Sequence, residues 1–115
     1  MQTVEDRLAD FDRYVNESVL PQMLRDANAA GLKLCFVRVQ RRPVDGKPPE
    51  QSAALRRYVS DLGTYLMRHG AEFRDDTGDP LLTLDMYEDG DHIARHARRR
   101  YTEILFERLP HIFVR

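Results

Sequence analysis

Apolar residues recur at helical spacing in three stretches of the chain, which are separated by two short runs of β-forming residues. The stripes predict helices over Val4–Ala27, from about Gln51 to His69, and over Ile93–Leu109. The nearly continuous apolar run Lys33–Val39 predicts a strand buried on both faces, and Ala71–Asp75 predicts a second, short strand. This order of helix, strand, helix, strand and helix is typical of βαβ units, in which helices cover a parallel sheet.

Single residues mark where the predicted helices begin, break and end. Thr3 can cap the first helix, and Pro21 interrupts its apolar stripe, so we expect a kink or a restart near Ser18. Gly31 is expected to close this helix as a left-handed cap, and Gly70 to end the second helix.

The chain of 115 residues predicts one α/β domain spanning residues 1–115, because no repeat, low-complexity segment or linker divides it. The expected fold class is α/β in three layers, with a small parallel sheet flanked by helices. A sheet of two or three parallel strands leaves faces and edges uncovered. We therefore expect a homo-oligomer, or a missing N-terminal segment, to complete it. The tail His111–Val114 is expected to add a strand or simply to pack.

Composition is that of a soluble globular protein, with 42% hydrophobic and 32% charged residues. The formal net charge of -1 argues against a general polyanion binder. No apolar run approaches membrane-spanning length and the charged start lacks a secretory signal, so we expect a cytoplasmic chain, as given, without a membrane partner. Cys35 is the single cysteine, which excludes an intrachain disulfide, and its apolar surroundings suit a small buried hydrophobe. We expect no cofactor.

The candidate chemistry lies in the stretch Leu84–Ile93, where acidic residues, a glycine and a histidine crowd together. Asp89-Gly90-Asp91-His92 is interpreted as a turn that delivers His92 to the start of the last predicted helix. Asp89, three residues earlier, can hold the Nδ1–H of the imidazole, which leaves Nε2 free as a base. The helix dipole would additionally favour a neutral resting histidine.

The same four residues, opening a helix near the end of an α/β chain, resemble the last sequence block of the SGNH (GDSL-type) hydrolases. In that family an Asp-x-x-His block supplies acid and base, which implies that Asp89 is the orienting carboxylate and His92 the general base. The order of elements from about Phe11 to Asp75 also resembles the second half of that fold. The resemblance thus implies a partial flavodoxin-like or SGNH-like sheet.

The resemblance covers only the C-terminal half of such a hydrolase. No Gly-Asp-Ser block is present, and Ser18, Ser52 and Ser60 lie in or beside helical patterns. The family's oxyanion-hole blocks also have no match. The implied function is therefore the Asp–His half of an ester-hydrolase or acyl-transfer site for a small ester or acylated substrate, with the serine supplied elsewhere or lost. The alternative is a non-catalytic binding or assembly module of unknown ligand.

Two other interpretations of the quartet stay open. In the first it is a plain turn, with Asp91 capping the last helix and His92 merely exposed. In the second it contributes to a metal site, because His92 and His96 are four residues apart on one expected helix face with Asp89 nearby. A zincin would need a glutamate where Ile93 stands, so we expect no metal.

Arginines supply nearly all the positive charge of the chain. Three of them near the end of the first predicted strand are the candidate substrate-binding residues: Arg38, Arg41 and Arg42. Successive helical residues point in different directions, so Arg98–Arg100 cannot form one flat basic patch. Glu103 and Glu107 stand at pairing distance along the helix. An ion-paired surface is therefore expected there, without nucleic acid.

Overall fold

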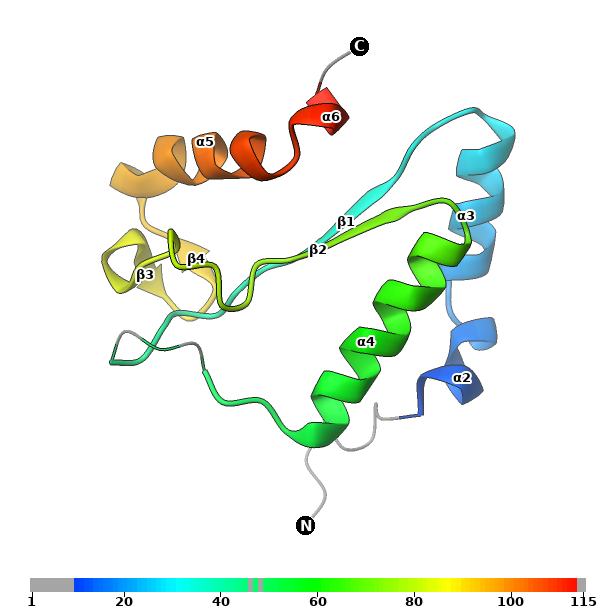
Figure 1. Ribbon diagram of the computed structural model, residues 1–115, viewed down its shortest axis with the longest axis horizontal. Coiled ribbons are helices and arrows are strands. Elements are labelled where there is room, and N and C mark those ends of the chain that lie inside the picture. Colours follow the sequence, from blue (N-terminus) through cyan, green and yellow to red (C-terminus); the bar gives the residue numbers. More distant parts are fainter. Residues whose placement is uncertain (1–9, 46, 48, 114–115) are drawn as a thin grey trace. The chain divides into compact units, whose positions relative to one another are not determined.

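The computed structural model describes residues 10–45, 47 and 49–113, which form a mixed α/β structure (Figure 1). The expected cap at Thr3 and the start of the first predicted helix lie outside these residues. The chain divides into two compact units. The first comprises Met1–Phe36 and Glu50–Arg74, and the second comprises Val37–Pro49 and Asp75–Arg115.

From residue 10 on, the described part of the first unit contains α2 (Phe11–Tyr14), the 3-10 helix η1 (Val15–Glu17) and α3 (Leu20–Ala29) in succession. The expected restart is confirmed at Ser18, whose backbone is extended. Its hydroxyl donates to the Val15 carbonyl at 2.6 Å and accepts from the Leu20 amide at 3.2 Å. Pro21 lies in the first turn of α3, where a missing backbone N–H leaves no helical bond unmade.

Helix α4 (Ala53–Arg68) matches the predicted second helix to within two residues at its start and one at its end. Ser52 caps it by accepting a hydrogen bond from the Leu55 amide at 3.0 Å. Gly63, inside this helix, packs closely against the ring of Phe73, which leaves little room for a side chain at this position. An added Cβ would be 3.0 Å from Cδ1 of Phe73.

Helices α3 and α4 end in the same way. Gly31 has φ +69° and Gly70 has φ +84°, the left-handed conformation that glycine adopts without a side-chain clash. In both cases the residue after the glycine donates to a carbonyl five residues earlier, at 2.8 Å after α3 and 2.9 Å after α4. These are Schellman motifs, and both predicted glycine caps are confirmed.

The core of the first unit is a cluster of buried residues, Leu24, Leu66 and Ala71. Leu66 is 0% exposed, the deepest side chain of the cluster. Partly buried residues from helices and strands pack around it: Leu20, Leu34, Phe36, Leu62, Tyr65 and Phe73. The apolar stripes that predicted α3 and α4 therefore face each other across this cluster.

Strands β1 (Cys35–Arg38) and β2 (Glu72–Asp75) pair in parallel, as predicted. The Glu72 amide donates to the Leu34 carbonyl at 2.9 Å, and the Asp76 amide donates to the Arg38 carbonyl at 3.0 Å. All strand residues are half-buried, so burial on both faces was wrong for the first strand. Half-burial raises the pKa of the Cys35 thiol, and the charge of Glu72 raises it further.

The second unit continues with short elements: η2 (Leu84–Met86), β3 (Tyr87–Asp89), β4 (His92–Ile93) and η3 (Arg95–Ala97). Helix α5 (Arg98–Arg108) and α6 (Pro110–Phe113) follow, so the expected tail is helical as far as Phe113, and its last residue, Val114, lies outside the described residues. The last long helix therefore starts five residues later than the apolar pattern predicted. The backbone of Ala94 is extended, so a helix cannot run from Ile93 through this residue. The amide of Ala94 donates instead to the Met86 carbonyl at 2.8 Å.

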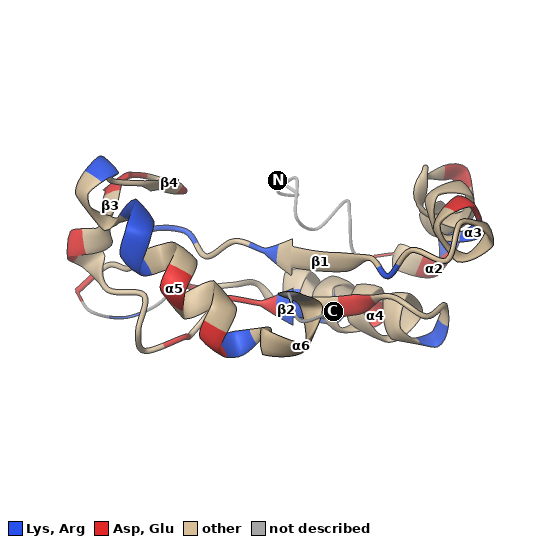
Figure 2. Cartoon of the chain, turned by 90° about the horizontal axis from the view of Figure 1, so that it is seen from above, with Lys and Arg blue, Asp and Glu red and all other residues tan. Residues whose placement is uncertain are grey.

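Helix α5 carries arginines in its first turn and again at its last residue, Arg108, with its glutamates between them (Figure 2). Arg99 pairs with Glu103 at 3.3 Å, and Arg100 pairs with Glu103 at 3.5 Å and Glu107 at 3.3 Å. The ion pairs expected from the sequence spacing are thus present.

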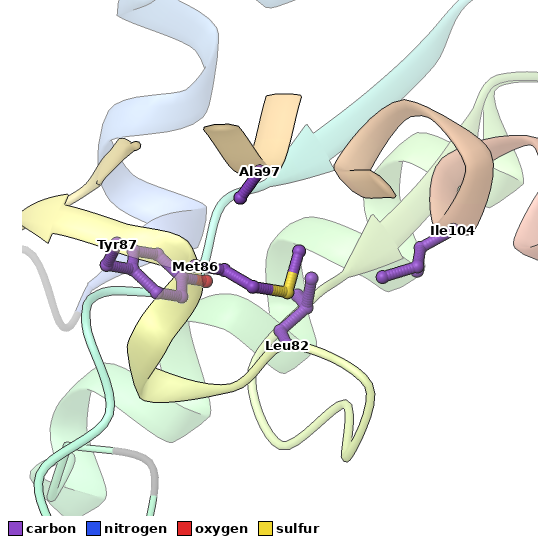
Figure 3. Close-up of a cluster of buried hydrophobic side chains, with 5 residues drawn as sticks. All are labelled: Leu82, Met86, Tyr87, Ala97 and Ile104. Carbon is purple, nitrogen blue, oxygen red and sulfur yellow. The ribbon is translucent and has the colours of Figure 1, made fainter. Parts of the chain in front are cut away.

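A second cluster of buried side chains forms the core of this unit: Leu82, Met86, Tyr87, Ala97 and Ile104 (Figure 3). The thioether of Met86 points toward Leu82 in this view. Ile104 comes from α5, as predicted, whereas Ala97, predicted on the same helical face, comes from η3. Within the part of the chain that is described, no helix is both long and apolar enough to cross a membrane.

Candidate functional site

Asp89 and His92 lie opposite each other across an antiparallel β-hairpin. Strands β3 and β4 pair Tyr87 with Ile93 and Asp89 with His92, and Gly90-Asp91 forms the turn. The Nδ1 of His92 is 2.5 Å from Oδ1 of Asp89. The structure therefore brings the two predicted site residues together and leaves Nε2 of the ring without that contact.

The predicted position of His92 at a helix N-terminus is wrong. His92 belongs to β4, and α5 begins only at Arg98. The physical reason is that the chain reverses at Gly90-Asp91, and pairing Tyr87 with Ile93 across this turn places two apolar residues on the core side. A helix dipole consequently has no role at this histidine. Asp91 does not cap α5 either, because Ala97 occupies the cap position without a side-chain hydrogen bond.

Electrostatics at the hairpin favour a charged histidine. The hydrogen bond that Nδ1–H of His92 donates to Asp89 and the charge of that carboxylate raise the pKa of His92, and the charges of Asp91 and Glu88 add to this effect. The side chains of His92 and Asp89 are 72% and 67% exposed. Solvent screens such a pair, so it orients the ring more than it stabilises the fold.

The arginines at the end of β1 divide into two kinds. Arg38 forms an ion pair with Asp75 across the two strand ends at 3.1 Å. Arg41 and Arg42 have exposed side chains. The amide of Arg42 donates to the Gly90 carbonyl at 2.5 Å, which attaches the Arg41–Arg42 segment to the hairpin turn. Two of the three candidate substrate-binding arginines are therefore open beside the hairpin.

The serines of the chain all belong to the first unit. Ser18 bridges the helical segments η1 and α3, and Ser52 caps α4. Ser60 is an exposed residue of α4. Two of the three serine hydroxyls are thus already used in local hydrogen bonds.

His96 does not join His92 in a metal-binding group. Its Nε2 lies 3.1 Å from the carbonyl oxygen of Asp85, a backbone group. Among the residues described, no three histidine, cysteine, aspartate or glutamate side chains are placed to hold a metal ion.

A cavity of about 240 Å³ lies after the carboxyl ends of β1 and β2, within the second unit. Gln40, 3% exposed, forms its wall and accepts a hydrogen bond from the Gly78 amide at 2.7 Å. Its Nε2 donates to the Leu82 carbonyl at 3.4 Å. Leu84 and Pro43 also line the cavity. The sequence reasoning missed this site, although a polar residue directly after a predicted parallel strand is the available signal.

Two acidic residues after β2 hold the loop beside this cavity. Asp76, 3% exposed, accepts a hydrogen bond from the hydroxyl of Tyr101 at 2.9 Å. Asp79 accepts two hydrogen bonds from the guanidinium of Arg108, each at 3.0 Å. Both contacts connect the loop to α5, so the helix fixes the cavity wall.

No protein-family model, no curated protein and no solved structure matches this chain.

Proposed function

We propose that the chain carries the Asp–His half of an ester-hydrolase or acyl-transfer site of the SGNH type, with the serine nucleophile supplied by another segment or chain. The observation that supports this most directly is the contact between Asp89 Oδ1 and His92 Nδ1. The parallel pairing of β1 and β2 suits a partial flavodoxin-like sheet, which is the second point in its favour.

In the proposed reaction, His92 acts from its neutral form, and its Nε2 accepts the proton of a serine hydroxyl as the hydroxyl oxygen attacks the ester carbonyl. The imidazolium then donates this proton to the departing alcohol, and an acyl-serine remains. Water releases the acyl group by the same proton transfers in reverse. Asp89 keeps Nδ1 protonated and stabilises the transient positive charge of the ring. Arg41 and Arg42 stand where an anionic part of the substrate would lie.

Because Asp89 and His92 are exposed to water, the segment or chain that provides the serine must also shield them from it. An ion pair open to water is weak, and donors that stabilise an oxyanion act strongly only where water is excluded. The supplying segment must therefore cover His92 as well as bring the hydroxyl and the oxyanion donors.

A fluorophosphonate probe tests the proposal, because it labels only serines that a neighbouring base activates. The full natural gene product, tagged at its C-terminus, is purified from its own cells with the chains that accompany it. We expect one labelled serine, lost in His92→Ala and reduced in Asp89→Asn. His96→Ala is the matched control, since His96 contacts a backbone carbonyl instead of a carboxylate.

Two outcomes contradict the proposal. The first is tagged material without any labelled serine. The second is labelling that His92→Ala leaves at its original level.

A second candidate function is a non-catalytic binding module, favoured by the cavity beside Gln40 because neither Asp89 nor His92 lines it. A small ligand that stabilises the parent chain against heat would occupy this cavity. Leu84→Trp should abolish that stabilisation by filling the space, whereas His92→Ala should preserve it. The opposite pattern assigns the ligand to the hairpin instead.

A further inference from the structure

A second cavity, of about 370 Å³, lies in the first unit between α3 and the end of α4. Arg25 and Asn28 line it from α3, and Tyr65 of α4 and His69, the residue directly after α4, line it from the other side. Residues three or four apart share one face of a helix, so each helix presents its pair to the same space. Asn16 of η1 completes the polar part of the lining.

The polar lining of this cavity consists of hydrogen-bond donors and contains no carboxylate. A guanidinium, an imidazole, a phenol and two carboxamides can all donate. Arg25 donates to the amide oxygen of Gln22 at 2.9 Å, which leaves most of its N–H groups for another partner. By contrast, Arg38 and Arg108 are paired with carboxylates. Arg25 thus bonds to a neutral side chain, Gln22, which in turn donates to Asp26 at 2.7 Å, and Arg25 lies beside an open space.

The walls of the cavity are held in place by contacts of their own. The Nδ2 of Asn28 donates to the His69 carbonyl at 3.3 Å, which joins α3 to the end of α4. The rings of Tyr65 and His69 lie 4.4 Å apart, and Phe11 packs edge-on against Tyr65 with ring centres 5.5 Å apart. Leu24 contributes buried apolar surface. The cavity therefore combines one cationic donor, Arg25, with neutral donors and an aromatic wall whose position is fixed by these contacts.

We propose that this cavity binds a small organic oxyanion, a phosphate monoester or a carboxylate, with Arg25 paired to the anionic group and the Tyr65–His69 wall against the organic body. The planar fork of arginine matches the oxygens of either group. The site lies outside the hairpin and shares no residue with the proposed acyl-transfer site. A negative result for the anion site therefore does not affect the proposed acyl-transfer site, and the reverse is also true.

An NMR titration of the ¹⁵N-labelled chain tests this site, with phenyl phosphate and benzoate as probes at constant ionic strength. We expect saturable shifts of the amides of Asn16, Arg25 and His69. Arg25→Gln should weaken binding about tenfold to a hundredfold, the loss expected for a charge-assisted hydrogen bond. Arg68→Gln is the matched control. It removes an equal charge from an exposed residue next to His69 that does not line the cavity.

Asn16→Asp is the second variant, because it places a carboxylate in the lining at an exposed position of η1. It should weaken binding of both probes while the spectrum stays that of the folded chain. Tighter binding of phenyl phosphate assigns the site to phosphate monoesters, and tighter binding of benzoate assigns it to carboxylates. Absence of saturable shifts, or equal loss in Arg25→Gln and Arg68→Gln, overturns the proposal.

Discussion

Replacement of Leu66 by alanine is predicted to lower the free energy of unfolding of the first unit by about 3–4 kcal/mol. Leu66 is 0% exposed and lies at the centre of the cluster with Leu24 and Ala71. Loss of three carbon groups from a buried side chain removes roughly 2.4 kcal/mol of transfer free energy. The remainder comes from the cavity, because helices α3 and α4 are held by their caps and cannot fully close over it.

Urea unfolding of the parent and the variant, followed by circular dichroism, measures the difference. Met67→Ala is the control on the same helix, since Met67 is 63% exposed, and it should change the free energy of unfolding by no more than about 0.5 kcal/mol. Leu66→Met keeps the volume and should lower it by less than about 1.5 kcal/mol, so it remains measurable if the alanine variant does not fold. Equal effects of Leu66→Ala and Met67→Ala would refute the assigned core.

Four further predictions follow from the hairpin, the helix ends and the sheet. Asp89→Asn should lower the pKa of His92 toward its ordinary value, as measured by NMR titration, because the carboxylate is the main cause of the raised pKa. In the parent chain, the stability that the Asp89–His92 pair contributes is fully present below the pKa of histidine in the unfolded chain. This stability is lost as the pH rises through the raised pKa of His92 in the folded chain. If the pKa of His92 is the same in Asp89→Asn as in the parent, the Asp89–His92 contact is contradicted. The purified chain should not turn over a short-chain activated ester, since the described serines are not placed on the hairpin; turnover that disappears in His92→Ala would contradict this. Gly31→Ala should lower the free energy of unfolding by about 1–2 kcal/mol because of its left-handed backbone, and Gly90→Ala, without positive φ or close neighbours, should not. Light scattering at micromolar concentration should show self-association, because a two-stranded sheet leaves edges to cover; a stable monomer that binds no hydrophobic dye would speak against it.

The elements that sequence reasoning predicted well are those bounded by local signals. Gly31 and Gly70 ended their helices as expected, and the restart near Ser18 followed from Pro21. These residues act on the backbone within a few positions, so their effect is independent of the rest of the fold. Strands β1 and β2 were also located, but their degree of burial was not, because it depends on which residues pack over them; the hairpin strands β3 and β4 were not predicted.

The position of His92 was predicted wrongly for a non-local reason. Ile93 and Ala97 are four residues apart and fit a helical stripe, yet Ile93 pairs with Tyr87 in the hairpin. The contact between Asp89 and His92 was predicted because a separation of three residues brings the two groups together in either setting. Both cavities were missed, since residues as distant in sequence as Arg25 and His69 meet only in the folded chain.

Helix α5 has consequences for the order in which the chain folds. Its first turn carries Arg98 and Arg99 at the positive end of the helix dipole, and Ala97 gives it no side-chain cap. Its ion pairs run from arginine to glutamate, the less favourable order along a helix. This segment is therefore a poor helix in isolation, and it gains its structure from buried Ile104 and from Arg108 bound to Asp79.

Helix α4 has the opposite character, with a serine cap at one end and a Schellman motif at the other. Such a helix can form early, with contacts that are close in sequence. The folding nucleus is thus expected in the first unit, around α4. Helix α5 should form only after the loop that follows β2 is ordered, because Asp79 of that loop binds Arg108.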